Sequence, residues 1–206
     1  MTESDVQPIS RPGGRTARTR AAVCDATLAE LAAHGYAGLT VEGVAARSGV
    51  HKTTVYRRWG GVDGLVVDVL ALADEDDWRP PDTGTLEGDL VGLVRAVAAT
   101  FGDPAEAAAP TAFVAAAFQS ARAAAALHAF FAERHRRSAA VVTRAIARGE
   151  VPAGTDADAV VTAAVAPFYY RVLLAGESPT AVPVEQSAAA VAHAARAGVY
   201  AGGKAH

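Results

Sequence analysis

The sequence predicts an all-α fold, and three observations support that class. Alanine is abundant, and long stretches free of glycine and proline favour helices. Apolar side chains recur at three- and four-residue spacing, as on the buried face of a helix. No segment alternates between apolar and polar residues beside a hairpin turn signal, so strands are not expected.

The first third of the chain contains four expected helices behind a polar arm. Residues 1–14 hold two prolines and two glycines among polar residues, and we expect a flexible arm there. Gly35 is expected to end the first helix, and Thr40 to cap the second. The expected helices run from Arg15 to His34, from Val41 to the turn at Gly49, from Lys52 to Trp59, and through Leu65 to Leu72.

Five longer helices are expected after an acidic, proline-containing loop at 74–82. Glycine and proline residues mark the breaks between several of them. Pro167 should bend the fourth, because proline removes one helical hydrogen bond. The expected helices cover about 85–101, 104–120, 121–149, 156–175 and 184–197.

The segment Thr40–Trp59 meets three requirements of a helix-turn-helix. A small residue, Ala45, stands where two steeply crossing helices approach each other. Gly49 follows four residues later, in the turn, where a positive φ is needed. Val55 returns an apolar side chain from the second helix to the first. This spacing predicts two short helices that cross through a tight turn.

The second helix of this unit carries a dense set of polar donors. With Val55 turned inward, the outward side chains are His51, Lys52, Thr53, Thr54, Tyr56, Arg57 and Arg58. The start of such a helix reads base edges in the major groove of DNA, while hydroxyls and flanking cations hold phosphates. The alternative is an ordinary corner between two helices whose charged side chains are only solvated. Such a corner does not require so many cations and hydroxyls on one helix face.

Charge is distributed unevenly along the chain. The net charge is −3, yet residues 11–60 contain eight Lys and Arg residues and three acids. This segment is therefore +5, and the remainder of the chain is −8. Such asymmetry indicates that one end meets a polyanion and the other does not.

The same segment resembles the N-terminal signature of the tetracycline-repressor (TetR) family of regulators. The resemblance covers about 15–70 and rests on Gly35–Val41, Val44-Ala45, Gly49-Val50 and Thr54–Trp59. It implies that the first helix braces the reading helix, that Thr40 and Tyr56 contact phosphates, and that residues 51–54 face bases. The candidate DNA contacts are Thr40, Arg47, His51, Lys52, Thr53, Thr54, Tyr56, Arg57 and Arg58.

One position departs from the family pattern. Members commonly place Lys or Arg just inside the helix after the reading helix, where it meets a phosphate, whereas this chain has Val62. Backbone N–H groups at that helix start can still hold a phosphate. Asp63 and the glycines at 60, 61 and 64 predict a weaker and more flexible anchor.

The resemblance further implies a two-domain regulator. It assigns 15–72 to a DNA-binding domain and 73–200 to a larger helical ligand-sensing and dimerisation domain, with 201–206 as a tail. We expect a homodimer that binds a pseudo-palindromic operator in double-stranded DNA and that a small-molecule effector releases. A weaker similarity to one branch of the family lies at Arg148–Glu150 and Pro167–Leu174.

Aromatic residues concentrate in the second domain, and the resemblance implies that some of them line a ligand cavity. Few charges accompany them, so we expect a largely apolar effector. The candidate ligand contacts are Phe101, Phe113, Phe118, His128, Phe130, Phe168, Tyr169 and Arg171. For any single aromatic residue, a place in the ordinary core is the alternative.

Two apolar stripes run along the last two expected helices. One consists of Val161, Val165, Phe168 and Val172, and the other of Val184, Ala188, Val191 and Ala195. In the resembling family these two helices form a four-helix dimer interface, which makes the stripes candidate contacts between two copies. Packing within one chain is the alternative.

Other classes of protein find little support. The sequence has no phosphate-cradling glycine loop after a strand, no His-Glu-x-x-His motif and no nucleophile elbow, so neither an enzyme nor a cofactor is expected. His128 and His135, like the acidic run 74–77, lack the context of a metal site. The alternative function is a small-molecule receptor or partner-binding scaffold with a degenerate helix-turn-helix, which Val62 slightly favours.

Three further observations concern location. Cys24 is the single cysteine, which excludes an internal disulfide and fits a reducing cytoplasm. The acidic N-terminus lacks the basic and apolar regions of a signal peptide. The stretch between Glu106 and Arg122 is shorter than the ~20 residues that a membrane span requires, and Pro110 interrupts it. No membrane partner is expected.

Overall fold

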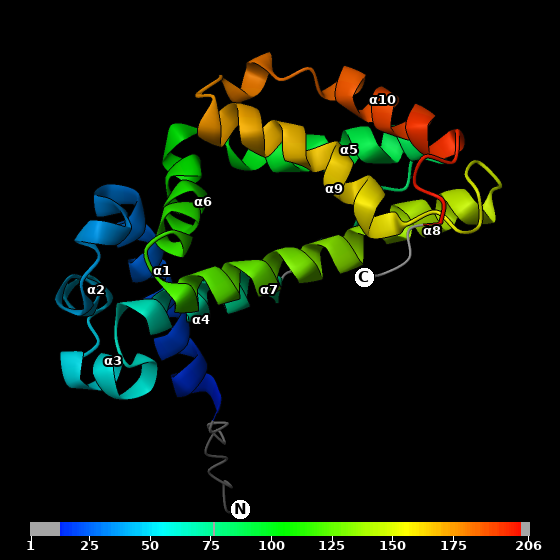
Figure 1. Cartoon of the computed structure of the whole chain (residues 1–206). Coiled ribbons are helices and arrows are strands. Elements are labelled where there is room, and N and C mark those ends of the chain that lie inside the picture. The colour runs from blue at the N-terminus through cyan, green and yellow to red at the C-terminus, as the bar shows by residue number, and fades with distance from the viewer. Residues whose placement is uncertain (1–12, 76, 203–206) are drawn as a thin grey trace, which may run out of the picture.

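The computed structural model describes residues 13–75 and 77–202, which form an all-helical chain (Figure 1). The helices are α1 (Gly13–Gly38), α2 (Val41–Ser48), α3 (Lys52–Trp59), α4 (Val62–Asp74), α5 (Leu86–Thr100), α6 (Pro104–Ala117), α7 (Ala121–Ser138), α8 (Ala140–Ala147), α9 (Ala157–Tyr169) and α10 (Val184–Arg196). A π-helical turn (Tyr170–Leu174) extends α9, and a 3₁₀ turn (Pro179–Ala181) precedes α10. β-type pairing in this part of the chain is an isolated bridge between Thr155 and Ala201. The predicted all-α fold class is confirmed.

The helix boundaries differ from the predicted ones at a few places. α1 already includes Gly13 and Gly14, which the sequence pattern assigns to the arm, while residues 1–12 lie outside the described residues. Gly35 interrupts α1 with φ 64°, as a helix-ending glycine does. The predicted helix at 121–149 is divided at Ala139, whose backbone angles are helical and whose neighbours are neither glycine nor proline.

Pro167 lies inside α9, shortly before the π-helical turn. In that turn the N–H of Ala175 donates a hydrogen bond to the carbonyl of Tyr170, five residues earlier, at 2.9 Å. Proline has no N–H to donate, and a π-helical turn is one way in which a helix absorbs such an irregularity. A widened turn thus follows Pro167 at the end of α9, and the bend expected at Pro167 stays a prediction.

Two hydrophobic cores divide the chain. The first contains α1–α4 with parts of α6 and α7, and its fully buried side chains include Val44, Val55 and Leu65. The second lies among α5, α8, α9 and α10, around Leu90 and Phe168. Figure 1 shows α7 running from beside α4 toward α8, so this helix connects the two ends. α6 packs against α1 and ties the N-terminal helices to the rest of the chain.

The apolar stripes of α9 and α10 face the core of their own chain. Buried there are Val161, Val165, Phe168, Val184, Ala188, Val191 and Ala195, and Val172 packs partly buried against the same core. The expectation that the stripes meet a second copy is wrong, because α9 and α10 pack on each other and on α5. On the outer side, Tyr170 and Leu174 are 62% and 73% exposed.

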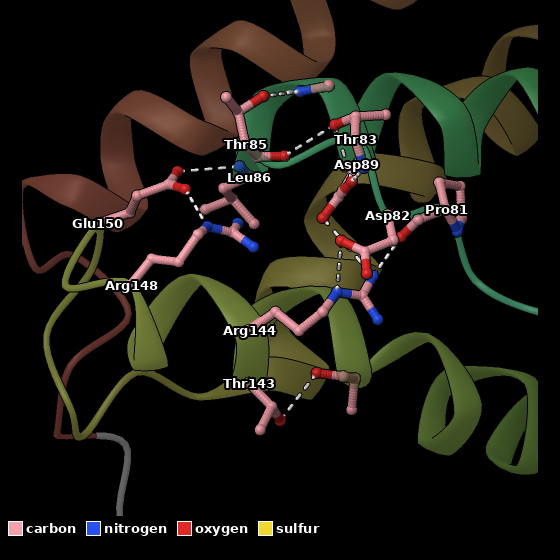
Figure 2. Close-up of polar contacts among 12 residues, drawn as sticks. Pro81, Asp82, Thr83, Thr85, Leu86, Asp89, Thr143, Arg144, Arg148 and Glu150 are labelled. Carbon is pink, nitrogen blue, oxygen red and sulfur yellow. Dashed lines mark hydrogen bonds and ion pairs between the residues drawn. The ribbon is translucent and has the colours of Figure 1, made fainter.

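A polar network fixes the loop between α4 and α5 on α8 (Figure 2). Asp89 of α5 is fully buried and accepts hydrogen bonds from the backbone N–H and the hydroxyl of Thr83, at 2.6 and 2.8 Å. Arg144 of α8 donates to the carbonyl of Pro81, and its Nη2 lies 3.6 Å from the second oxygen of Asp89. Because a buried charge is costly unless it is paired, this network determines where α5 begins relative to α8.

Candidate nucleic-acid interface and ligand cavity

The helix-turn-helix is held by a cap, a turn and a buried contact. The Thr40 hydroxyl accepts a hydrogen bond from the N–H of Gly43 at 3.0 Å and so caps α2. Gly49 has φ 69°, a left-handed conformation that favours glycine. Val44 of α2 and Val55 of α3 have no exposed surface. α2 and α3 therefore present fixed faces to solvent.

The outward face of α3 carries cations and hydroxyls. Exposed side chains are His51, Lys52, Thr53, Tyr56, Arg57 and Arg58. Thr54 is partly buried, whereas Val55 and Trp59 are buried. Nδ1 of His51 accepts a hydrogen bond from the N–H of Thr53 at 3.4 Å, so this side chain also caps α3. Most of the predicted donors thus share one accessible surface.

Two of the predicted arginines have partners within the chain. Nε of Arg47 donates to the buried carboxylate of Glu30 on α1 at 2.8 Å. Gly43 makes room for this carboxylate, since a Cβ at position 43 would lie 2.7 Å from its Oε2. Arg58 donates to the carbonyl of Thr16 at 3.4 Å. These contacts brace α2 and α3 against α1.

Asp68 of α4 fixes the end of α3. Its carboxylate accepts hydrogen bonds from the Trp59 indole at 2.7 Å and from Nε of Arg20 at 2.9 Å. Arg20 also donates to Glu75, just after α4, at 2.7 Å. Cys24 lies 3.8 Å from the Asp68 carboxylate, and burial raises the pKa of its thiol to about 12. Asp68 therefore joins α1, α3 and α4, a role that sequence reasoning missed.

The junction between α3 and α4 is closely packed. A Cβ at Gly64 would stand 1.7 Å from the carbonyl oxygen of Trp59, so only glycine fits there without a shift of the backbone. Val62 packs partly buried against the N-terminal core. Asp63 accepts a hydrogen bond from the Tyr36 hydroxyl, and burial followed by this bond raises the pKa of Tyr36. Close packing thus accounts for the glycine at position 64, and the weaker anchor expected at this junction stays a prediction.

A cavity of about 410 Å³ lies between α4, α5, α6, α7 and α9, and its size is that of a small-molecule site. Most of its wall is apolar. α7 contributes one continuous face to it, made of Leu127, Phe130, Phe131, Arg134, His135 and Ser138. Leu70 and Ala73 of α4 also line it, so the contents of the cavity touch the helix that follows α3.

The predicted ligand contacts fall into two groups. Lining the cavity are Phe101, Phe113, Phe130 and Tyr169. Phe168 is buried in the adjoining core, with its ring 5.8 Å from that of Phe101. Outside the cavity lie Phe118, His128 and Arg171. Phe118 is 83% exposed at the end of α6, His128 is exposed on α7, and Arg171 pairs with Glu177 at 2.8 Å.

Among the polar groups of the cavity, the sequence pointed to Tyr169 but not to Arg134. The guanidinium of Arg134 lies 5.4 Å from the ring centroid of Trp78 and 5.2 Å from that of Phe130. Burial raises the pKa of Tyr169 to about 12, although the positive charge of Arg134 opposes the rise. The three- and four-residue spacing from Leu127 onward is the sequence feature that identifies this face of α7.

Comparison with known families agrees with this geometry. Residues 23–69 match the family described as bacterial regulatory proteins, tetR family. Residues 80–191, more than half of the chain, match the family described as tetracyclin repressor-like, C-terminal domain. The chain belongs to the TetR family.

Individual transcriptional regulators resemble this chain to different extents. The HTH-type transcriptional regulator AqdR of Rhodococcus erythropolis is 29% identical over 170 residues, which are 82% of each chain. An HTH-type transcriptional regulator of Mycobacterium tuberculosis is 43% identical over 67 residues, which span 32% of this chain and only 33% of that relative. The crystal structure of the TetR family transcription regulator SCO0332 is 28% identical, with a TM-score of 0.65 over 88% of this chain and 98% of that chain.

Within residues 13–75 and 77–202 of this TetR-family chain, one helical segment has the length and apolar composition of a membrane span. It covers Ala157–Leu174 and has a mean hydropathy of 1.3. In the fold, the inner side of this segment packs into the core beside α5 and α10. Core packing on that side accounts for much of its apolar composition.

Proposed function

We propose that this TetR-family chain is a DNA-binding transcriptional repressor of the cytoplasm, released from its operator by a small, largely apolar ligand. The outward face of α3 carries the proposal. There Lys52, Tyr56 and Arg57 are exposed together, on a helix whose Val55 and Trp59 are buried. A solvent-exposed helix face that binds nothing would need neither these hydroxyls nor the burial of Val55 and Trp59 that fixes the helix. No catalytic role is proposed.

The accessible side chains divide into base-reading and phosphate-holding groups. Lys52 stands in the first turn of α3, where a helix in the major groove meets base edges. Tyr56 and Arg57 lie one turn farther along, and Thr40 is exposed at the start of α2, positions from which side chains hold phosphates. Arg47 is a weaker candidate, because its charge is already paired with a carboxylate of α1.

Binding to DNA at increasing salt concentration tests the proposal. The logarithm of the association constant should fall linearly with the logarithm of salt concentration, because phosphate contacts release counterions. Tyr56→Phe should weaken binding to all duplexes about equally, whereas Lys52→Ala should relax the preference at one base by about 1–3 kcal/mol. Arg136→Gln, an exposed change on α7, is the control and should alter neither.

Two results would count against this function. Lys52→Ala with equal losses on matched and mismatched operators would refute the base-reading role. Duplex binding that is absent, or independent of salt, would favour a small-molecule receptor or scaffold whose helix-turn-helix no longer reads DNA. Val62 supports that alternative, because it supplies no cation at the start of α4.

We infer that two copies pair through the outer sides of α9 and α10. Tyr170 and Leu174 are exposed there, and Thr162 and Ala166 precede Tyr170 at four-residue spacing on the exposed side of α9. This row of small and apolar residues suits close helix packing. Residues of this row can be substituted without altering the buried apolar stripes of α9 and α10.

Sedimentation equilibrium tests the pairing. Ala166→Glu should give monomers with much weaker operator binding, because it places a charge in an apolar contact. Ala125→Glu makes the same change on an exposed part of α7 and should stay dimeric. A wild-type chain that remains monomeric at high micromolar concentration would contradict the inference.

The cavity is the proposed effector site. Its mostly apolar wall favours a ligand of the same character. Bacillus subtilis FadR, which shares this fold at 13% identity with a TM-score of 0.58, was solved in complex with stearoyl-CoA. Thermal shifts with hydrophobic and with polar metabolites test the site. Phe113→Ala should alter the ligand response and leave DNA binding intact. If only highly charged molecules released the protein from its operator, the assignment of an apolar ligand would be contradicted.

A further inference from the structure

His51 is fixed at the start of α3 by its backbone and by its ring. Its carbonyl accepts hydrogen bonds from the N–H groups of Thr54 and Val55, at 2.8 and 3.2 Å, and so closes the first turn of the helix. Nδ1 of its imidazole accepts a hydrogen bond from the N–H of Thr53 at 3.4 Å. His51 is nevertheless exposed. The ring that caps α3 therefore belongs to the surface proposed to face DNA.

This cap determines which nitrogen of the ring carries the proton. A backbone N–H can only donate, so Nδ1 of His51 contributes its lone pair and has no proton. The hydroxyl of Thr53 lies 2.8 Å from the same nitrogen and therefore also donates to it. An imidazole whose Nδ1 is unprotonated carries its proton on Nε2. His51 thus presents a hydrogen-bond donor at Nε2 and no acceptor there.

The donor of His51 points away from the helix. Nδ1 and Nε2 lie on either side of Cε1, so a ring whose Nδ1 faces the first turn of α3 directs Nε2 outward. Nε2 has no hydrogen-bond partner among the residues that the structure describes. Because Nδ1 is already bound, the ring is oriented before DNA arrives, and less conformational entropy is lost on binding.

The four bases differ in how their major-groove edges suit a single donor. Guanine presents two acceptors, N7 and O6, and no donor. Adenine places its N6 amino group, a donor, beside N7, and cytosine presents its N4 amino group. Thymine has one acceptor, O4, beside its methyl group. An outward N–H at the start of α3 therefore fits guanine best.

We propose that His51 is a specificity-determining residue of the helix-turn-helix, and that its Nε2–H donates to N7 or O6 of a guanine in each half-site of the operator. The inference rests on the proposed DNA-binding function and narrows the operator by one base pair in each half-site. Thr53 acts through His51, because its N–H and its hydroxyl both hold Nδ1. It is a positioning residue for this contact.

Binding to duplexes that differ at one base pair tests the assignment. In fluorescence anisotropy with the full chain, each position of the selected half-site carries each of the four base pairs in turn. The wild type should prefer guanine at one position by about five-fold or more, as one hydrogen bond implies. His51→Asn should lose this preference and keep those at other positions, because asparagine caps a helix but is too short to reach the base. His128→Asn, the same change at an exposed position of α7, should keep every preference.

A role in capping alone predicts a different result. His51→Asn would then keep every base preference, and this would overturn the assignment. Loss of a preference for a base other than guanine would also overturn it. Circular dichroism of His51→Asn should match the wild type, because the cap is retained.

The position of the proton can be measured without DNA. Imidazole nitrogen chemical shifts of the free chain in alkaline buffer should show the proton of His51 on Nε2, and a proton on Nδ1 would overturn the assignment. Failure of the proposed DNA-binding function is distinguishable, because the wild type would then bind no duplex while Nε2 still carried the proton. That result would overturn the base contact together with the function on which it rests.

Discussion

Replacement of Asp68 by asparagine should loosen the unit formed by α1, α3 and α4. Two nitrogen donors converge on the carboxylate, the Trp59 indole at 2.7 Å and the Arg20 guanidinium at 2.9 Å, and the Cys24 thiol is a weaker third donor at 3.8 Å. Asparagine has a similar shape but offers one acceptor oxygen, and its amide nitrogen is itself a donor. One of the two donors therefore loses its partner.

The surroundings of the two donors set the size of the effect. Trp59 is buried, and a buried N–H without a partner costs about 1–3 kcal/mol. Arg20 loses less, because its side chain is 23% exposed and it keeps its contact with Glu75. We expect the free energy of unfolding to fall by about 1–2 kcal/mol in Asp68→Asn.

Urea unfolding followed by circular dichroism measures this loss. Asp25→Asn is the matched control, since it makes the same charge change at an exposed position of α1 and should stay within about 0.5 kcal/mol of the wild type. Asp68→Asn should also weaken operator binding, because Trp59 anchors the end of α3. Equal stability of the two variants would refute the view that Asp68 fixes α3.

Two further changes test the packing and the ionisation of the N-terminal helices. Gly64→Ala should lower stability by about 1–3 kcal/mol and weaken DNA binding, because its Cβ would stand 1.7 Å from the carbonyl oxygen of Trp59. Thermal melting beside Gly14→Ala, whose Cβ meets open space, checks this, and equal melting temperatures would contradict it. Burial holds the pKa of the Cys24 thiol near 12 in the folded chain, whereas the thiol of the unfolded chain ionises with its ordinary pKa of 9.0. The free energy of unfolding should therefore fall as the pH rises from 9.0 toward about 12. In urea titrations at increasing pH, Cys24→Ala should lose less stability at alkaline pH than the wild type. An equal loss of stability in both would mean that other groups cause it.

The helices and the helix-turn-helix could be predicted because local residues encode them. Thr40 caps its own helix, and Gly49 supplies a left-handed turn, so each acts within a few positions of the chain. The division at Ala139 could not be predicted in this way, because its backbone is helical and no glycine or proline marks it. That division depends on how α7 and α8 pack on their neighbours.

The sites beyond the helix-turn-helix were harder to predict, because they depend on contacts distant in sequence. An apolar stripe such as that of Val161 shows that one face of a helix is covered, but whether its own chain or a second copy covers it depends on the tertiary fold. Phe118 and Phe130 look alike in sequence, yet only Phe130 lines the cavity. Asp68 reads as an ordinary charge on an apolar helix until the fold places Trp59 beside it.

Selection of bound sequences from a random duplex pool, followed by footprinting on the purified chain, tests sequence-specific DNA binding by α3 most directly. We expect enrichment of a pseudo-palindrome whose half-sites lie about one helical turn or slightly more apart, with both half-sites protected. Substitution of Lys52 should change the enriched base at one position of each half-site. A pool that shows no enrichment, or an enriched motif that is the same for the wild type and for a chain lacking the exposed cations of α3, would show that α3 does not read a DNA sequence.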